Sequence, residues 1–251
     1  MNKIKISVVS YLNSKPFIYG LQHSSIMNNI ELQLDMPSVC AGKLIDGKVD
    51  VGLVPVAILP QLKEYHIISD FCIGAEGKVA SVMLYSNVPL KEIKSILLDY
   101  QSRTSVTLVK VLAMYFWQIC PQWKLATEGF ENEIAGTTAA VIIGDRTFGL
   151  KDKYPFSYDL AEEWYKFTRL PFVFACWVAN KKLPDTLIAQ FNEALKFGLD
   201  NRPIIIDELS KNNKYQVELS EYLHQSIKYD YNSSKKQALE LFLSYIRKIS
   251  G

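Results

Sequence analysis

The stretch of sequence that decides the fold is LDYQSRTSVT, at residues 98–107. The apolar run that leads into it, 96–98, is typical of a strand, whereas from Val106 onward apolar residues recur at the spacing of one helix face. The turn between them is therefore predicted to be the N-terminus of a helix. Ser102 stands where the N-cap is expected, and serine is among the residue types that cap helices best.

The predicted helix start is rich in groups that bind anions. Unpaired backbone N–H groups and the positive end of the helix dipole favour a negative charge there. The hydroxyls of Ser102, Thr104 and Ser105 add hydrogen-bond donors. Arg103 could add a bidentate contact to a carboxylate. An ordinary capped helix with a solvated arginine explains the same residues, so the rest of the chain has to decide between the two interpretations.

Composition is that of a folded protein without a nucleic-acid or membrane partner. The 251 residues suffice for one or two domains, and 49% hydrophobic residues are enough for a sizeable core. The net charge of +2 comes without a block of Lys and Arg, so we expect no nucleic-acid partner. No apolar run reaches the ~18–20 residues of a membrane span, and no signal-peptide core precedes residue 13. We therefore expect a cytoplasmic protein with no membrane partner.

The cysteines and histidines do not form a metal site. No CxxC or Cys/His spacing of a zinc site occurs, and no Gly-rich phosphate loop is present. We therefore predict no metal and no cofactor. The separated thiols are assigned to core packing, and they are Cys40, Cys72, Cys120 and Cys176.

Alternation of strands and helices predicts an α/β fold with two lobes. Strands that begin at Ile4, Ile30 and Asp50, with helices between them, form a βαβαβ start and imply a parallel sheet. The apolar runs 79–85 and 172–179 are typical of strands, and we interpret them as the two crossings between lobes. The predicted lobes are lobe one, 1–86 and 173–251, and lobe two, 87–172.

Two further strand ends carry polar groups toward the cleft where such sheets bind ligands. One is SYLNSKPF at 10–17, which leads into a helix and contains Asn13, a residue that also suits a simple turn. The other follows the strand at 139–143 and contains Gly144 and Asp145. The carboxylate of Asp145 either orients a donor or caps the next turn.

Taken together, these motifs resemble the chorismate dehydratases of the futalosine route to menaquinone, which share the fold of type II periplasmic solute-binding proteins. The resemblance covers the chain up to about residue 179, and beyond it only helical character matches. The motifs that carry it are SYLNSKPF at 10–17, DVGLVPV at 50–56, DYQSRTS at 99–105, IGDR at 143–146 and LPFVF at 170–174.

The resemblance implies two mixed sheets joined by two hinge crossings, with the active site in the cleft between the lobes. It also implies a hydro-lyase that removes water from chorismate, a small-molecule substrate, to give 3-[(1-carboxyvinyl)oxy]benzoate. We expect Asn13 and Ser81 to hold the reacting groups. The predicted substrate-binding residues are Ser10, Tyr11, Ser102, Arg103, Thr104, Ser105, Gly144 and Asp145.

The general base is not evident from these motifs, because none of them places a His, Glu or Lys for that role. Asp99, Asp145 or the side-chain carboxylate of the substrate could take the ring proton. We favour the substrate carboxylate, because a site that fixes both carboxylates can gain much from orientation alone.

Two other functions are compatible with the predicted fold. One is a non-catalytic binding protein for a small aromatic or cyclic carboxylate, and the other is the effector domain of a transcription regulator. The missing signal peptide argues against the first, and a chain that starts at its first strand argues against the second. A new aromatic absorbance on incubation with chorismate would distinguish all three.

Overall fold

The first lobe is built on a six-stranded mixed sheet. The computed structural model describes residues 3–150, 152–211 and 215–250. In spatial order the strands are β11 (Lys228–Asp230), β4 (His66–Ala75), β10 (Phe172–Ala179), β3 (Val51–Pro55), β1 (Ile4–Val9) and β2 (Ile30–Asp35). Strands β1, β2 and β3 are parallel and are joined by α1 (Lys15–Gln22) and α2 (Pro37–Ile45), as the sequence predicts. Strand β10 runs antiparallel between β3 and β4.

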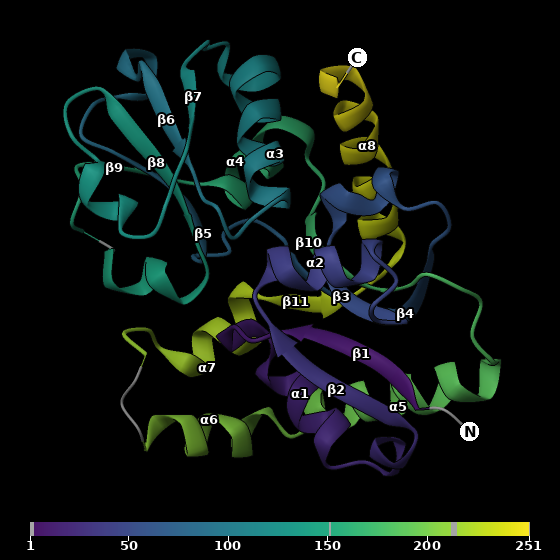
Figure 1. The fold of residues 1–251 in the computed structure, drawn as a ribbon. Coiled ribbons are helices and arrows are strands. Elements are labelled where there is room, and N and C mark those ends of the chain that lie inside the picture. Colours follow the sequence, from purple (N-terminus) through teal and green to yellow (C-terminus); the bar gives the residue numbers. More distant parts are fainter. Residues whose placement is uncertain (1–2, 151, 212–214, 251) are drawn as a thin grey trace.

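The second lobe is built on a five-stranded mixed sheet (Figure 1). In spatial order its strands are β7 (Gln122–Leu125), β6 (Ser95–Leu98), β8 (Thr138–Ile143), β5 (Val82–Ser86) and β9 (Phe156–Asp159). Strands β6, β7 and β8 are parallel, whereas β5 is antiparallel to β8 and β9. The predicted fold class, α/β with two mixed sheets, is confirmed.

The first crossing between the sheets lies earlier than the predicted boundary after residue 86, because β5 pairs entirely within the second sheet. The extended run 79–85 is broken at Ala80, whose φ is +63°. Only the part of the run after this break pairs as a strand.

The C-terminal helix contacts the second lobe although it follows the first lobe in the sequence. The remaining helices are α3 (Thr104–Leu112), α4 (Leu160–Thr168), α5 (Asp185–Asp200), α6 (Arg202–Ser210), α7 (Leu219–Glu221) and α8 (Ser233–Ser250). Figure 1 shows α8 beside α3, and the ring of Phe242 on α8 packs edge-on against Trp164 on α4 at 5.9 Å. Aromatic packing of this kind stabilises the contact beyond the buried area.

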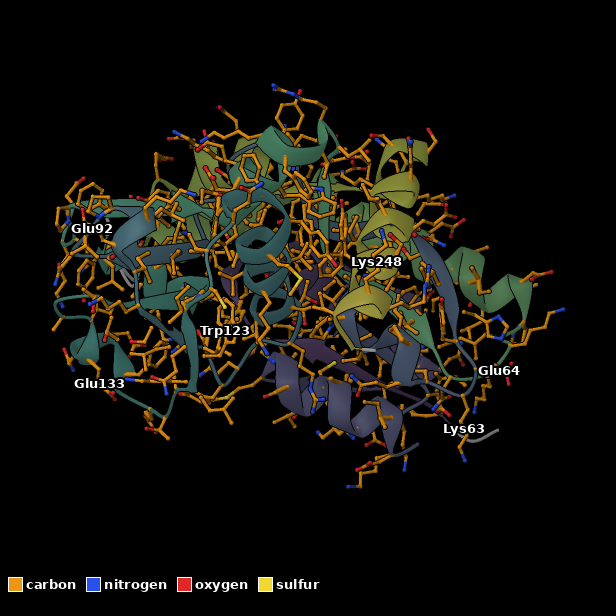
Figure 2. All side chains as sticks on the ribbon, turned by 90° about the horizontal axis from the view of Figure 1, so that it is seen from above. Lys63, Glu64, Glu92, Trp123, Glu133 and Lys248 are labelled. Carbon is orange, nitrogen blue, oxygen red and sulfur yellow. The ribbon has the colours of Figure 1, made fainter. Side chains whose placement is uncertain are left out.

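One apolar core runs through both lobes. Cys40, Cys72 and Cys176 are buried in it, as predicted. Cys120, in contrast to the prediction, is exposed in the loop between Trp117 and β7. Seen from above, Glu92 and Glu133 lie toward one end of the molecule and Lys63 and Glu64 toward the other (Figure 2). Within the described residues, no helix is long and apolar enough to span a membrane.

Candidate functional site

Strand ends and helix starts from both lobes line a pocket with a cavity volume of about 70 Å³. Ligand sites of α/β proteins lie at such junctions of strand ends. Most of the predicted site residues line it, namely Tyr11, Asn13, Ser81, Ser102, Thr104, Ser105 and Gly144. Ser10, Arg103 and Asp145 are not among the lining residues, and the side chains of Ser10 and Arg103 are exposed.

The start of α3 lies one residue later than predicted. Arg103 occupies the N-cap position and the helix begins at Thr104. Ser102 still satisfies a free backbone group, because its Oγ accepts a hydrogen bond from the Ser105 N–H at 3.0 Å. The later start leaves the Arg103 side chain in solvent, while Thr104 and Ser105 face inward.

Thr104 lines the pocket and links the two lobes. Its hydroxyl accepts a hydrogen bond from the Ala57 N–H at 3.2 Å and donates one to the Phe174 carbonyl at 3.1 Å. Ala57 and Phe174 belong to the first lobe. The hydroxyl that the sequence suggests for anion binding therefore holds the lobes together instead, because its one proton is donated to the Phe174 carbonyl.

Tyr11 and its neighbour Leu12 also connect the two lobes. The Tyr11 hydroxyl donates to Gln101 Oε1 in the second lobe, and the Leu12 N–H donates to Asp145 Oδ1 at 3.1 Å. Gly144 packs directly on the Tyr11 ring. Its φ is +67°, and a Cβ at this position would lie 2.9 Å from two ring atoms.

Electrostatically, the pocket is unusual for an anion site. Its described lining includes hydroxyl groups and the Asn13 amide but no charged side chain. An anion bound there would be held by neutral donors and by the N-terminus of α3.

Asp99 is fully engaged in holding the second lobe. Its carboxylate accepts hydrogen bonds from the N–H groups of Gln101 at 2.9 Å and Ile143 at 3.0 Å, and it forms an ion pair with Arg146. Its side chain is completely buried. These contacts explain the place of Asp99 in the motif without a role as the general base.

A family assignment follows from comparison with known proteins. A sequence model of the family described as menaquinone biosynthesis matches residues 4–248. The chain belongs to this family. Among the relatives of this family member are a chorismate dehydratase of Campylobacter jejuni, 26% identical over 94% of each chain, and one of Thermus thermophilus, 25% identical over 79% of each chain. The resemblance found in the motifs is thereby confirmed.

Solved structures share the two-lobed fold with this family member. A protein of Archaeoglobus fulgidus superposes with a TM-score of 0.77 at 13% identity, covering 99% of this chain and 98% of the other. A Candida albicans protein with the generic periplasmic binding protein fold superposes with a TM-score of 0.61 at 13% identity, covering 99% and 94%. The periplasmic-binding-protein-like fold predicted from the sequence is confirmed.

Two buried tyrosines from the C-terminal part donate hydrogen bonds to predicted site residues, and nothing in the sequence points to either of them. Tyr222 donates to Ser81 Oγ at 2.8 Å, and Tyr229 donates to the Asn13 carbonyl at 2.9 Å. The chain has 14 tyrosines, and nothing near these two distinguishes them from the others.

Asp159 is a further residue that the sequence does not reveal. Its Oδ2 accepts from the N–H groups of Val79 at 2.8 Å and Ala80 at 2.7 Å, while Oδ1 accepts from those of Ala161 and Glu162 at the start of α4. Burial raises the pKa of Asp159 to about 6, although these four N–H groups act in the opposite direction. The carboxylate fixes the crossing that leads into Ser81.

The described residues contain no group of three or more His, Cys, Asp or Glu side chains arranged to hold a metal ion. The expectation of a reaction without metal or cofactor stays a prediction.

Proposed function

We propose that this protein is a chorismate dehydratase that removes water from chorismate to give 3-[(1-carboxyvinyl)oxy]benzoate. The observation that carries the proposal is the pocket between the lobes, whose described lining offers hydroxyls, an amide and a helix N-terminus but no charged group. The names of two relatives and the menaquinone family add support.

Chorismate matches this pocket in the groups that it presents. It is a small ring with two carboxylates and one hydroxyl, and each of these accepts hydrogen bonds. Ser102 and Ser105 at the start of α3 are suited to one carboxylate, because hydroxyls and free N–H groups concentrate there. Asn13 and Ser81, from the other side of the pocket, are suited to the reacting part of the ring.

The elimination breaks two bonds of the substrate. The C–H bond next to the ether oxygen gives up its proton, its electron pair becomes the third double bond of the ring, and the neighbouring C–O bond releases hydroxide. Proton and hydroxide together make one water molecule. Because the described lining has no charged side chain, we assign the proton to the side-chain carboxylate of the substrate itself. The task of the protein is then to hold the reacting groups in alignment.

The test is incubation of the purified protein with chorismate. We expect a new aromatic absorbance and a product whose mass is that of chorismate less one water. Asn13→Ala should lower kcat by about tenfold or more and leave KM within about twofold, the pattern of an interaction made mainly in the transition state.

A different outcome would favour the binding-protein alternative. If chorismate raises the melting temperature of the protein but yields no product, the pocket binds carboxylates without chemistry. If Asn13→Ala turns over at the wild-type rate, the turn at Asn13 is structural and the assignment of the reacting groups is wrong.

A further inference from the structure

The C-terminal segment places a buried tyrosine beneath Ser81, one of the two residues to which the proposed function assigns the chemistry. Tyr222 is 1% exposed, and its hydroxyl lies 2.8 Å from Ser81 Oγ. The two residues are 141 positions apart in the sequence. The contact therefore exists only because the chain returns to the cleft after it has completed the second sheet and before it forms β11.

In this hydrogen bond the Tyr222 hydroxyl is the donor and Ser81 Oγ is the acceptor. Burial raises the pKa of Tyr222, so the phenol keeps the proton that it donates. The phenol proton is therefore directed to Ser81 Oγ.

The backbone of Ser81 is fixed as well. Its carbonyl accepts from the Gly144 N–H at 2.8 Å, and the two residues before it are held by Asp159. With its oxygen accepting from Tyr222, the hydroxyl of Ser81 retains one proton of its own, and Ser81 lines the pocket. That proton is available to an oxygen atom of the substrate.

We propose that Tyr222 is a positioning residue that fixes Ser81 as a hydrogen-bond donor to the substrate, an inference that rests on the proposed function. Hydrogen bonds in such a chain polarise and strengthen one another. The ring of Tyr222 is itself held by Phe148, which packs edge-on at 5.0 Å.

The test is a double-mutant cycle measured as chorismate turnover. Tyr222→Phe keeps the ring and removes only the hydroxyl, so we expect kcat to fall about fivefold to tenfold, the worth of one hydrogen bond, with KM within about twofold. In a Ser81→Ala background, the Tyr222→Phe change should lower kcat no further, because the two residues act as one unit.

The matched control is Tyr85→Phe. Tyr85 is also buried, at 3% exposure, and it is not among the residues that line the pocket. Its hydroxyl donates a hydrogen bond of 3.3 Å to the Thr147 carbonyl. This variant should keep the wild-type kcat. Should Tyr222→Phe fail to fold, Phe148→Leu serves instead. It loosens the ring while keeping the hydroxyl, and it should lower kcat about twofold to threefold only when Ser81 is present.

The outcomes separate this inference from the function on which it rests. Absence of product from the wild-type protein overturns the proposed function and the inference with it. Product from the wild type, together with a wild-type kcat in folded Tyr222→Phe, overturns the inference alone. The inference is also overturned if the fold-losses in kcat caused by Tyr222→Phe and by Ser81→Ala multiply in the double variant, because Tyr222 would then not act through Ser81.

Discussion

At the start of α3, Ser105 and Arg103 lie in opposite environments although only one residue separates them. Ser105 is 3% exposed and lines the pocket, whereas Arg103 is exposed and lies outside the lining. Successive residues of a helix are rotated by ~100°, so residues two apart point to nearly opposite sides. We therefore propose that hydroxyls and backbone N–H groups, rather than the guanidinium, would bind a carboxylate at this helix start.

The first prediction compares these two residues. Arg103→Ala should leave KM for chorismate within about twofold, because the lost charge is in solvent. Ser105→Ala should raise KM about threefold to tenfold, the effect of one lost hydrogen bond of ~1 kcal/mol. Steady-state kinetics on both variants, with melting temperatures as the control for folding, measures the difference. A rise in KM of more than about twofold for Arg103→Ala would instead support the contact between Arg103 and a carboxylate that the sequence suggests.

Individual residues could be predicted where their role depends on local structure. Ser102, Thr104 and Ser105 follow a strand and begin a helix, and this arrangement is visible in a few consecutive letters. The hydrogen bond from Tyr222 to Ser81 could not be predicted, because it joins residues from distant segments and depends on how the lobes pack. Polar residue types mark a site in the sequence, whereas their partners are decided by tertiary structure.

At the scale of elements, the crossing into the second sheet depends on one carboxylate. Ala80 adopts a φ of +63°, which is uncommon for a residue other than glycine. Asp159 stabilises this conformation through the N–H groups of Val79 and Ala80 and at the same time caps α4. The apolar run 79–85 predicts one unbroken strand, because it contains no glycine or proline that would indicate a break.

The second prediction concerns the pH dependence of stability. The folded-state pKa of Asp159, about 6, lies above the unfolded value of 3.8. Between these values the folded chain binds more protons, so the contribution of Asp159 to the free energy of unfolding falls as pH rises from about 4 to about 6. At about 1.4 kcal/mol per pH unit, this loss amounts to about 3 kcal/mol.

Urea unfolding of the wild type and Asp159→Asn between pH 4 and 7 measures this effect. The amide that the variant carries at position 159 cannot titrate, so this position adds no pH dependence to the stability of the variant. Its NH₂ group faces N–H donors, so the variant should be less stable than the wild type. The stability advantage of the wild type should therefore shrink with rising pH. An advantage that grows with pH would mean that the four N–H groups favour the carboxylate more than burial disfavours it.

The C-terminal helix shows a second limit of prediction at this scale. Its amphipathic spacing predicts a helix at 235–249, and α8 covers Ser233–Ser250. The same spacing does not say which lobe receives the apolar face. In the structure the ring of Tyr245 packs against Tyr115 at 4.8 Å and Phe167 at 5.7 Å, both from the second lobe.

For the whole molecule, the third prediction is that the reaction needs no metal. The sequence has no metal-ligand spacing, and proton transfer to the substrate carboxylate requires no ion. Turnover of chorismate should be unchanged after exhaustive dialysis against a chelator. Loss of activity that a divalent ion restores would contradict the mechanism in which the substrate supplies its own base.

The two lobes are in contact at the pocket through the hydrogen bond between Tyr11 and Gln101 and through those that Thr104 makes. The βαβαβ start of the first sheet and the helix that follows the strand at 96–98 could be predicted, because strand and helix periodicity is local. The relative placement of the lobes could not, because it depends on a few long-range contacts such as that between Tyr11 and Gly144. Closure of this kind removes water from the pocket and assembles residues from both lobes around a ligand.

The last prediction tests closure at the contact between Gly144 and Tyr11, with Gly47 as the control. Both glycines have a φ of +67°, so alanine should cost each site a similar ~1–2 kcal/mol and lower the melting temperature by a few degrees. Only at Gly144 would the new Cβ meet a neighbour, the Tyr11 ring at 2.9 Å, whereas Gly47 has nothing within 4 Å. Gly144→Ala should therefore displace Tyr11, break its bond to Gln101, open the cleft and raise KM about fivefold or more, while Gly47→Ala keeps the wild-type KM. Solution X-ray scattering should give a larger radius of gyration for Gly144→Ala alone. If both variants have the wild-type KM and radius, the contact at Tyr11 does not hold the lobes closed.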